Sequence, residues 1–233
     1  KKLHRLIVTS STYRQDSKAS PSLLEKDPQN RLLARGPRFR LSGELIRDHM
    51  LQASGKLSGK MFGPGVYPPQ PLTVLAHAFG NKSWNASKGE DRYRRSIYTF
   101  IKRTAPFAGF MTFDGTSGEN CLAKRDRSNT PLQALTLLND EMYLELARAA
   151  GQEVHQKKDD PVQSLFRRFL TRPPKQSETD ALRAYYEQQI QRLEKGEIKP
   201  SEITATPKAT PELAGKILLA RAIMNLDEAI TKP

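Results

Sequence analysis

Three pairs of a capping residue and a proline mark helix starts in the C-terminal part of the chain. They are Thr130-Pro131, Asp160-Pro161 and Thr210-Pro211. A Thr or Asp side chain accepts a hydrogen bond from an unpaired N–H of the first turn, and proline suits the first helical position because it has no N–H to satisfy. Gln133 stands three residues after Thr130, so this pair also predicts a capping box.

Apolar residues recur at helical spacing after each of these starts. The first helix is expected to end at Gly151 and the second at Pro173-Pro174, and a third, capped at Ser177, is expected to end at Gly196. The residues expected to face inward are Leu132, Leu135, Leu138, Met142, Leu146, Leu165, Phe166, Phe169, Leu170, Leu182, Tyr185, Tyr186, Ile190, Leu193, Leu213, Ile217, Leu218, Ala222 and Met224. The pattern predicts a helical bundle for residues 131–233.

Helix signals in residues 1–130 are weaker and are separated by loops. The segments with helical spacing are 3–7, 28–34, 42–57 and 93–101, and the loop segments are 60–73 and 80–90. Strand signals are few, so the expected fold class is mainly α, an irregular helical domain with long Gly- and Pro-rich loops. We expect residues 1–233 to form a single helical domain that is a fragment of a larger protein.

The net charge of +13 lies entirely in the N-terminal half. Residues 1–130 hold 23 Lys and Arg against 10 Asp and Glu, whereas residues 131–233 hold 15 of each. A basic half favours an acidic partner, whether an acidic protein domain, an anionic glycan or a nucleic acid. The alternative is a solvated surface with arginines buried in ion pairs.

Several classes of site lack support in the sequence. Cys121 is the single cysteine, so an internal disulfide is impossible, and a lone cysteine is more often a small buried residue than a nucleophile. The sequence has no HExxH, CxxC or CxxCH motif, so we expect no metal site and no cofactor in this chain. No apolar run approaches the ~20 residues that a membrane span needs.

The densest polar segment runs from Phe113 to Gln133 and ends at a predicted helix start. Its candidate site residues are Asp114, Glu119, Arg125, Arg127, Asn129, Thr130 and Gln133. A helix N-terminus has unpaired N–H groups and a positive dipole, and arginines add donors, so this segment predicts an anion-binding pocket. The alternative is a structural network in which the acids pair with the arginines.

Two further interpretations of the sequence are open. Asp114 and Glu119 would act as a general acid and base if their carboxylates converge, which would make the chain a hydrolase for an anionic substrate. Segments 35–40 and 92–95 mix arginines with aromatic residues, a pattern that can bind single-stranded nucleic acid, although Tyr93 also falls on an inward helix face.

An ordered set of segments resembles a planctomycete-type domain of unknown function. The segments are 3–15, 27–41, 44–51, 63–71, 91–106, 113–121, 125–140 and 221–230. The chain departs from the family's pattern at Gly115-Thr116, where Ala-Pro is expected, and at Gly118, where Arg is expected. The resemblance implies an exported or periplasmic protein with a neighbouring cytochrome-c-like domain, and it supplies no catalytic residues.

The resulting hypothesis is a non-catalytic interaction and scaffold module of an exported, redox-associated multidomain protein. Its basic half would bind an acidic partner, such as a neighbouring domain or an anionic glycan. The alternatives are a hydrolase acting on an anionic substrate and a nucleic-acid-binding module.

Overall fold

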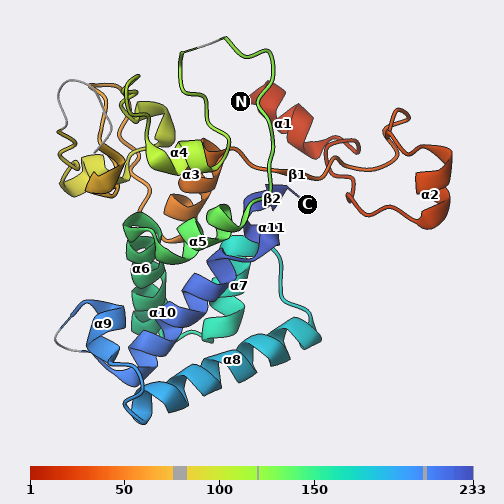
Figure 1. The fold of residues 1–233 in the computed structure, drawn as a ribbon. Helices are drawn as coiled ribbons and strands as arrows, with labels where there is room; N and C mark the ends of the chain where they lie inside the picture. The colour runs from red at the N-terminus through yellow and green to blue at the C-terminus, as the bar shows by residue number, and fades with distance from the viewer. Residues whose placement is uncertain (76–82, 120, 207–208, 233) are drawn as a thin grey trace. The chain divides into compact units, whose positions relative to one another are not determined.

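The computed structural model describes residues 1–75, 83–119, 121–206 and 209–232 (Figure 1). These residues divide into two compact units, one of residues 1–41 and 230–233 (unit 1) and one of residues 42–229 (unit 2). The fold is mainly α, as the sequence predicts. The expectation of a single domain stays a prediction.

The helices and strands are short in the first half of the chain and longer in the second. The α-helices are α1 (Lys2–Thr9), α2 (Pro21–Lys26), α3 (Gly43–Ala53), α4 (Ala108–Thr112), α5 (Pro131–Asn139), α6 (Glu141–Lys157), α7 (Pro161–Leu170), α8 (Gln176–Glu194), α9 (Pro200–Thr204), α10 (Pro211–Met224) and α11 (Asp227–Ile230). The 3₁₀ turns are η1 (Leu72–Leu75), η2 (Gly89–Tyr93) and η3 (Ser96–Tyr98), and the strands are β1 (Phe39–Arg40) and β2 (Thr231–Lys232).

Unit 1 consists of α1, α2 and an antiparallel pair of β1 with β2. The helix expected over residues 28–34 is wrong, because α2 precedes it and ends at Lys26. Ser20 caps α2 by accepting from the N–H of Leu23. The Asp27 carboxylate then accepts from the N–H groups of Arg31 and Leu32 at 2.8 Å each, which fixes the following residues as a turn.

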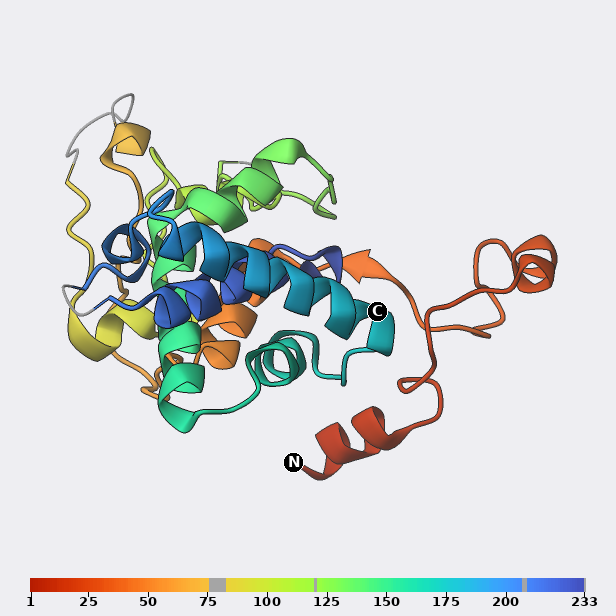
Figure 2. The same cartoon turned by 90° about the horizontal axis from the view of Figure 1, so that it is seen from below.

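The helices of unit 2 pack around α10, which contacts α6, α7, α8 and α9 (Figures 1 and 2). The prolines at 131, 161 and 211 occupy first-turn positions as predicted, and Asp160 and Thr210 accept bonds from the first-turn N–H groups of their helices. Leu146, Leu165 and Leu219 have no exposed surface and lie in the resulting core.

The sequence mispredicts the first of these helices. Asp140 interrupts it and caps α6, accepting from the N–H of Met142 at 2.9 Å. Gly151 does not end α6 but lies inside it, where an added Cβ would come within 2.7 Å of Ile217. This glycine therefore serves the close approach of α6 and α10. Leu132 and Leu135, expected inward, are 60% and 53% exposed.

The helix expected over residues 93–101 is also wrong. Its residues form parts of η2 and η3 followed by an extended segment. The main chain of Tyr98 and Phe100 pairs with Val66, with both N–H···O distances at 2.8 Å. Because this pairing draws the segment away from helical geometry, Ile97 and Ile101 are 80% and 73% exposed instead of inward.

Candidate functional site

Two buried arginines hold together the irregular part of unit 2. Arg47 of α3 is 1% exposed and donates to the carbonyl oxygens of Arg94 at 2.7 Å and Arg92 at 3.2 Å. Burial lowers the pKa of Arg47 to about 10, and Asp48 opposes this shift. Arg94 is also 1% exposed and donates to the carbonyl oxygens of Phe62 and Pro64. Arg47 and Arg94 are thus internal cross-links.

A third arginine of the same segment pairs with α6. Arg92 donates to Glu145 at 2.8 Å and to Glu141 at 3.1 Å, and the Tyr93 hydroxyl also donates to Glu145. Burial and the neighbouring Glu145 raise the pKa of Tyr93 to about 12. The charge pattern assigns the segment 92–95 to a basic surface, but all three of its arginines face protein partners, since Arg95 lies 3.7 Å from Asp48.

The polar segment forms a compact link at the start of α5. Both carboxylate oxygens of Asp114 accept from Ser128, one from its N–H at 2.8 Å and one from its hydroxyl at 2.7 Å. Gln133 is fully buried, and its Nε2 donates to the Ser128 hydroxyl and to the Thr112 carbonyl, both at 3.1 Å. Its Oε1 accepts from the N–H of Thr130 at 3.4 Å. These bonds join residues 112–114 to residues 128–133.

The other candidate residues of that segment are exposed. Glu119 is exposed, and its N–H donates to the Ser117 hydroxyl at 3.3 Å. Arg127 and Asn129 are exposed. Arg125 forms an ion pair with Glu44 of α3, in which Nη1 lies 2.8 and 2.9 Å from the two carboxylate oxygens. Anion binding by the segment and an acid/base role for Asp114 and Glu119 stay predictions.

A groove of about 470 Å³ lies beside this ion pair, between α3, η3 and α4. We call it the α3–α4 groove. Its polar lining residues are Glu44, Asp48, Arg95, Ser96, Thr99, Thr116 and Arg125, and its apolar ones are Leu45, Ile97, Phe100, Ile101, Pro106, Phe107 and Phe110, with Gly118 also present. The sequence marked only Arg125 of these residues as a candidate site residue, because the lining comes from five separate segments and alternates between apolar and charged.

The charged groups of the α3–α4 groove form two ion pairs. Burial alone would raise the pKa of Glu44, but hydrogen bonds from its own N–H and from Arg125 hold that pKa below its usual value. Asp48 accepts from the N–H of Ser96 at 2.6 Å, and its other oxygen lies 3.7 Å from Nε of Arg95. The hydroxyl of Thr99 is buried and has no hydrogen-bond partner among the described residues.

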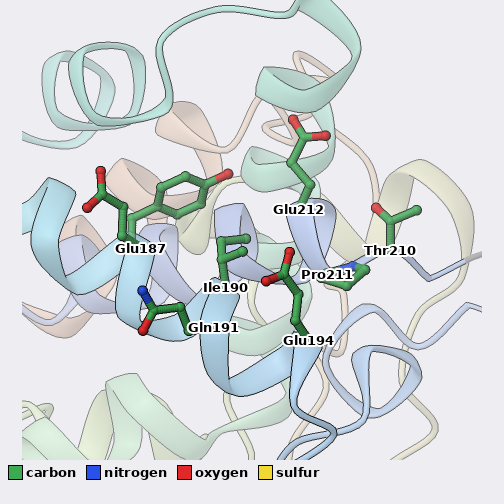
Figure 3. Close-up of a pocket in the computed structure, with 8 residues that line it drawn as sticks. Glu187, Ile190, Gln191, Glu194, Thr210, Pro211 and Glu212 are labelled. Carbon is green, nitrogen blue, oxygen red and sulfur yellow. The ribbon is translucent and has the colours of Figure 1, made fainter.

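A second hollow, of about 580 Å³, lies between α8 and the start of α10 (Figure 3). Its polar side chains include Glu187, Gln191, Glu194 and Glu212. Glu212 accepts from Lys216 at 2.7 Å, which lowers its pKa. Although this hollow is the larger, it is the more open of the two and lies on elements that hold none of the predicted site residues.

Within the described ranges, no group of three or more His, Cys, Asp and Glu side chains is placed to hold a metal ion. Cys121 is exposed, not buried as expected of a lone cysteine. His49 is engaged with the carbonyl oxygen of Phe169 at 2.8 Å. No helix in the described part of the chain has both the length and the apolar character of a membrane span.

These features define a mainly helical protein with an internally cross-linked irregular region and one groove of mixed lining. The family described as PSD1, protein of unknown function (DUF1553), matches residues 1–186, and the chain belongs to it. Comparison with curated proteins and with solved structures finds no significant match.

Proposed function

We propose that this chain is a non-catalytic interaction module of an exported, cytochrome-c-linked multidomain protein, and that unit 1 binds an acidic partner. The exported setting and the haem-bearing neighbour rest on the family resemblance. The observation that carries the binding role is the charge of unit 1, which has 11 Lys and Arg against three Asp and Glu, a net charge of +8 in 45 residues.

The three acidic residues of unit 1 offset only part of this charge. The buried carboxylate of Asp27 accepts from main-chain N–H groups, and the bond from Leu32 is the largest cause that lowers its pKa. Asp16 lies 3.9 Å from Lys18. By contrast, Arg5 and Arg14 are exposed. A surface of this kind attracts an acidic protein domain or an anionic glycan over a Debye length of about 8 Å at physiological salt.

The contacts of unit 2 support this choice over the two alternatives. Arg92 and Arg94 are occupied by protein partners, so the segment 92–95 offers few donors to a nucleic acid. Both oxygens of Asp114 accept from Ser128, which favours a structural role over general acid/base chemistry. In unit 1, Arg35 donates to the carbonyl oxygens of Asp27 and Pro28, whereas Arg5 and Arg14 are exposed.

The test is binding of the 233-residue chain to poly-L-glutamate and to polygalacturonate across a salt titration. Affinity should fall steeply with salt, and the double reversal Arg5→Glu with Arg14→Glu should weaken it at least tenfold, because four units of charge change on an exposed surface. The control is Lys195→Glu, which reverses the charge of an exposed residue directly after α8 and should have little effect on binding. Binding that is insensitive to salt, or equal losses for both variants, would contradict the proposal.

A further inference from the structure

We propose that the α3–α4 groove binds a carboxylate that is joined to an apolar group, such as an aromatic acid or the apolar C-terminus of a peptide. This site lies wholly in unit 2 and is independent of the basic surface of unit 1. Its volume of about 470 Å³ falls within the range of roughly 300 to 1,000 Å³ that is typical of small-ligand sites.

The apolar part of the ligand is indicated by the walls of the groove. Ile97 and Ile101 are 80% and 73% exposed, and Phe100 is 41% exposed. Single exposed apolar side chains are ordinary, but these three border one hollow together with Phe107 and Phe110, whose rings pack edge to face with centroids 5.0 Å apart. A hydrophobic ligand group that covered them would remove this surface from water.

The carboxylate is indicated by the hydrogen-bond capacity of the two arginines. A guanidinium has five N–H donors. In the described part of the chain, Arg125 uses only Nη1 for both bonds to Glu44, and Arg95 approaches Asp48 only through Nε. Both arginines therefore retain N–H donors. A planar guanidinium can donate two parallel hydrogen bonds to one carboxylate.

A cationic ligand is less favoured because the acids of the groove are already engaged. Both oxygens of Glu44 accept from Arg125, and Asp48 accepts from the N–H of Ser96. Arg47, whose Nη1 lies 4.0 Å from Asp48, adds a third positive charge next to two negative ones. The local balance thus favours an anion.

Thr99 supplies a second, independent indication of a ligand. This residue lines the groove and is 7% exposed, and its hydroxyl lacks a partner among the described residues. A buried hydroxyl without a partner is uncommon because its desolvation is not compensated. A ligand oxygen that accepted from this hydroxyl would compensate its desolvation.

The experiment titrates the isotope-labelled 233-residue chain with two matched pairs of probes and follows the amide resonances by NMR. One pair is 4-phenylbutanoate and its neutral amide, and the other is acetyl-Gly-Phe-Ile with a free carboxylate or with a C-terminal amide. We expect the acid of at least one pair to shift resonances at residues 95–101 and to bind about tenfold tighter than its amide, as expected for a charge-assisted bond. The tighter pair identifies the source of the carboxylate.

Three variants separate recognition from folding. Arg95→Gln should weaken acid binding about tenfold while leaving amide binding unchanged. Glu44→Gln should strengthen acid binding severalfold, because it removes a competing carboxylate from Arg125. Arg103→Gln, at an exposed arginine outside the groove, should change neither. Equal affinities of acid and amide, an unchanged affinity in Arg95→Gln, or the absence of shifts at residues 95–101 would overturn the proposal.

Discussion

The two parts of unit 2 are stabilised by different kinds of interaction. From α5 to α10, main-chain bonds lie within helices and the helices pack through apolar faces around α10. Between α3 and α5, the chain is mostly irregular, and buried side chains such as those of Arg47 and Gln133 bond to its carbonyl groups. Because loops cannot pair their own polar groups as helices do, a few long polar side chains take over that role.

This difference predicts that single polar residues matter more in the irregular region than in the helices. Arg47→Met should lower the free energy of unfolding by about 3 to 5 kcal/mol, because it leaves buried carbonyl groups without donors. Urea unfolding, monitored by circular dichroism, measures the loss.

The matched control for Arg47 is Arg103→Met, which changes an exposed arginine in the same region. It should alter the free energy of unfolding by less than about 0.5 kcal/mol. A loss of similar size in both variants would show that the buried bonds of Arg47 are not what stabilises the irregular region.

The helical part should instead be sensitive to volume. Gly151→Ala should cost about 1 to 3 kcal/mol, because the new Cβ would lie 2.7 Å from a side-chain atom of Ile217 and 2.9 Å from its main chain. Thermal unfolding should show a lowered Tm.

Gly59→Ala is the control for the Gly151 substitution. An added Cβ at Gly59 meets nothing within 4 Å, so this change should leave Tm the same or raise it slightly by restricting the unfolded chain. If Gly151→Ala lowered Tm no more than Gly59→Ala does, the close approach of α6 and α10 would not restrict the size of the side chain at position 151.

Local signals explain which parts of this fold were predictable from sequence. Thr130-Pro131, Asp160-Pro161 and Thr210-Pro211 are local signals, and all three helix starts are confirmed. The side chains of Asp160 and Thr210 accept from N–H groups three residues further on. Gly151 was mispredicted as a helix end, because the glycine is required by close contact with Ile217, a residue distant in sequence. Periodicity over residues 93–101 failed for a similar reason, since pairing with Val66 overrides it.

The candidate site follows the same division. The start of α5 and the position of Gln133 beside Thr130 are local and were predicted. The attachment of Asp114 to Ser128 depends on a loop closing back on itself, which spacing does not specify. The α3–α4 groove was not predicted as a site, although Arg125 and the segment 92–95 were each singled out, because Glu44, Arg95 and Arg125 meet only in the folded chain.

An ion-pair cluster in the helical part provides the smallest and most direct comparison with Arg47. Arg172 donates to Glu178 and Glu228, with the shortest distances at 2.7 Å, but its side chain is 32% exposed, against 1% for Arg47. The bond from Arg172 is the largest cause that lowers the pKa of Glu178 to about 2. Since the folded state holds the ionised carboxylate, this pair stabilises the fold above the unfolded pKa of 4.5 and loses its contribution as pH falls toward 2.

Glu178→Gln should therefore remove stability at neutral pH and flatten the decline between pH 4.5 and 2, as urea unfolding at several pH values can measure. Water screens a partly exposed pair, so we expect an effect of no more than about 1 kcal/mol. Glu187→Gln removes an exposed carboxylate from the same helix, so it is the matched control and should leave the pH profile unchanged. An effect at Glu178 as large as that at Arg47 would mean that the number of bonds, and not the burial of the arginine, sets the difference between the two regions.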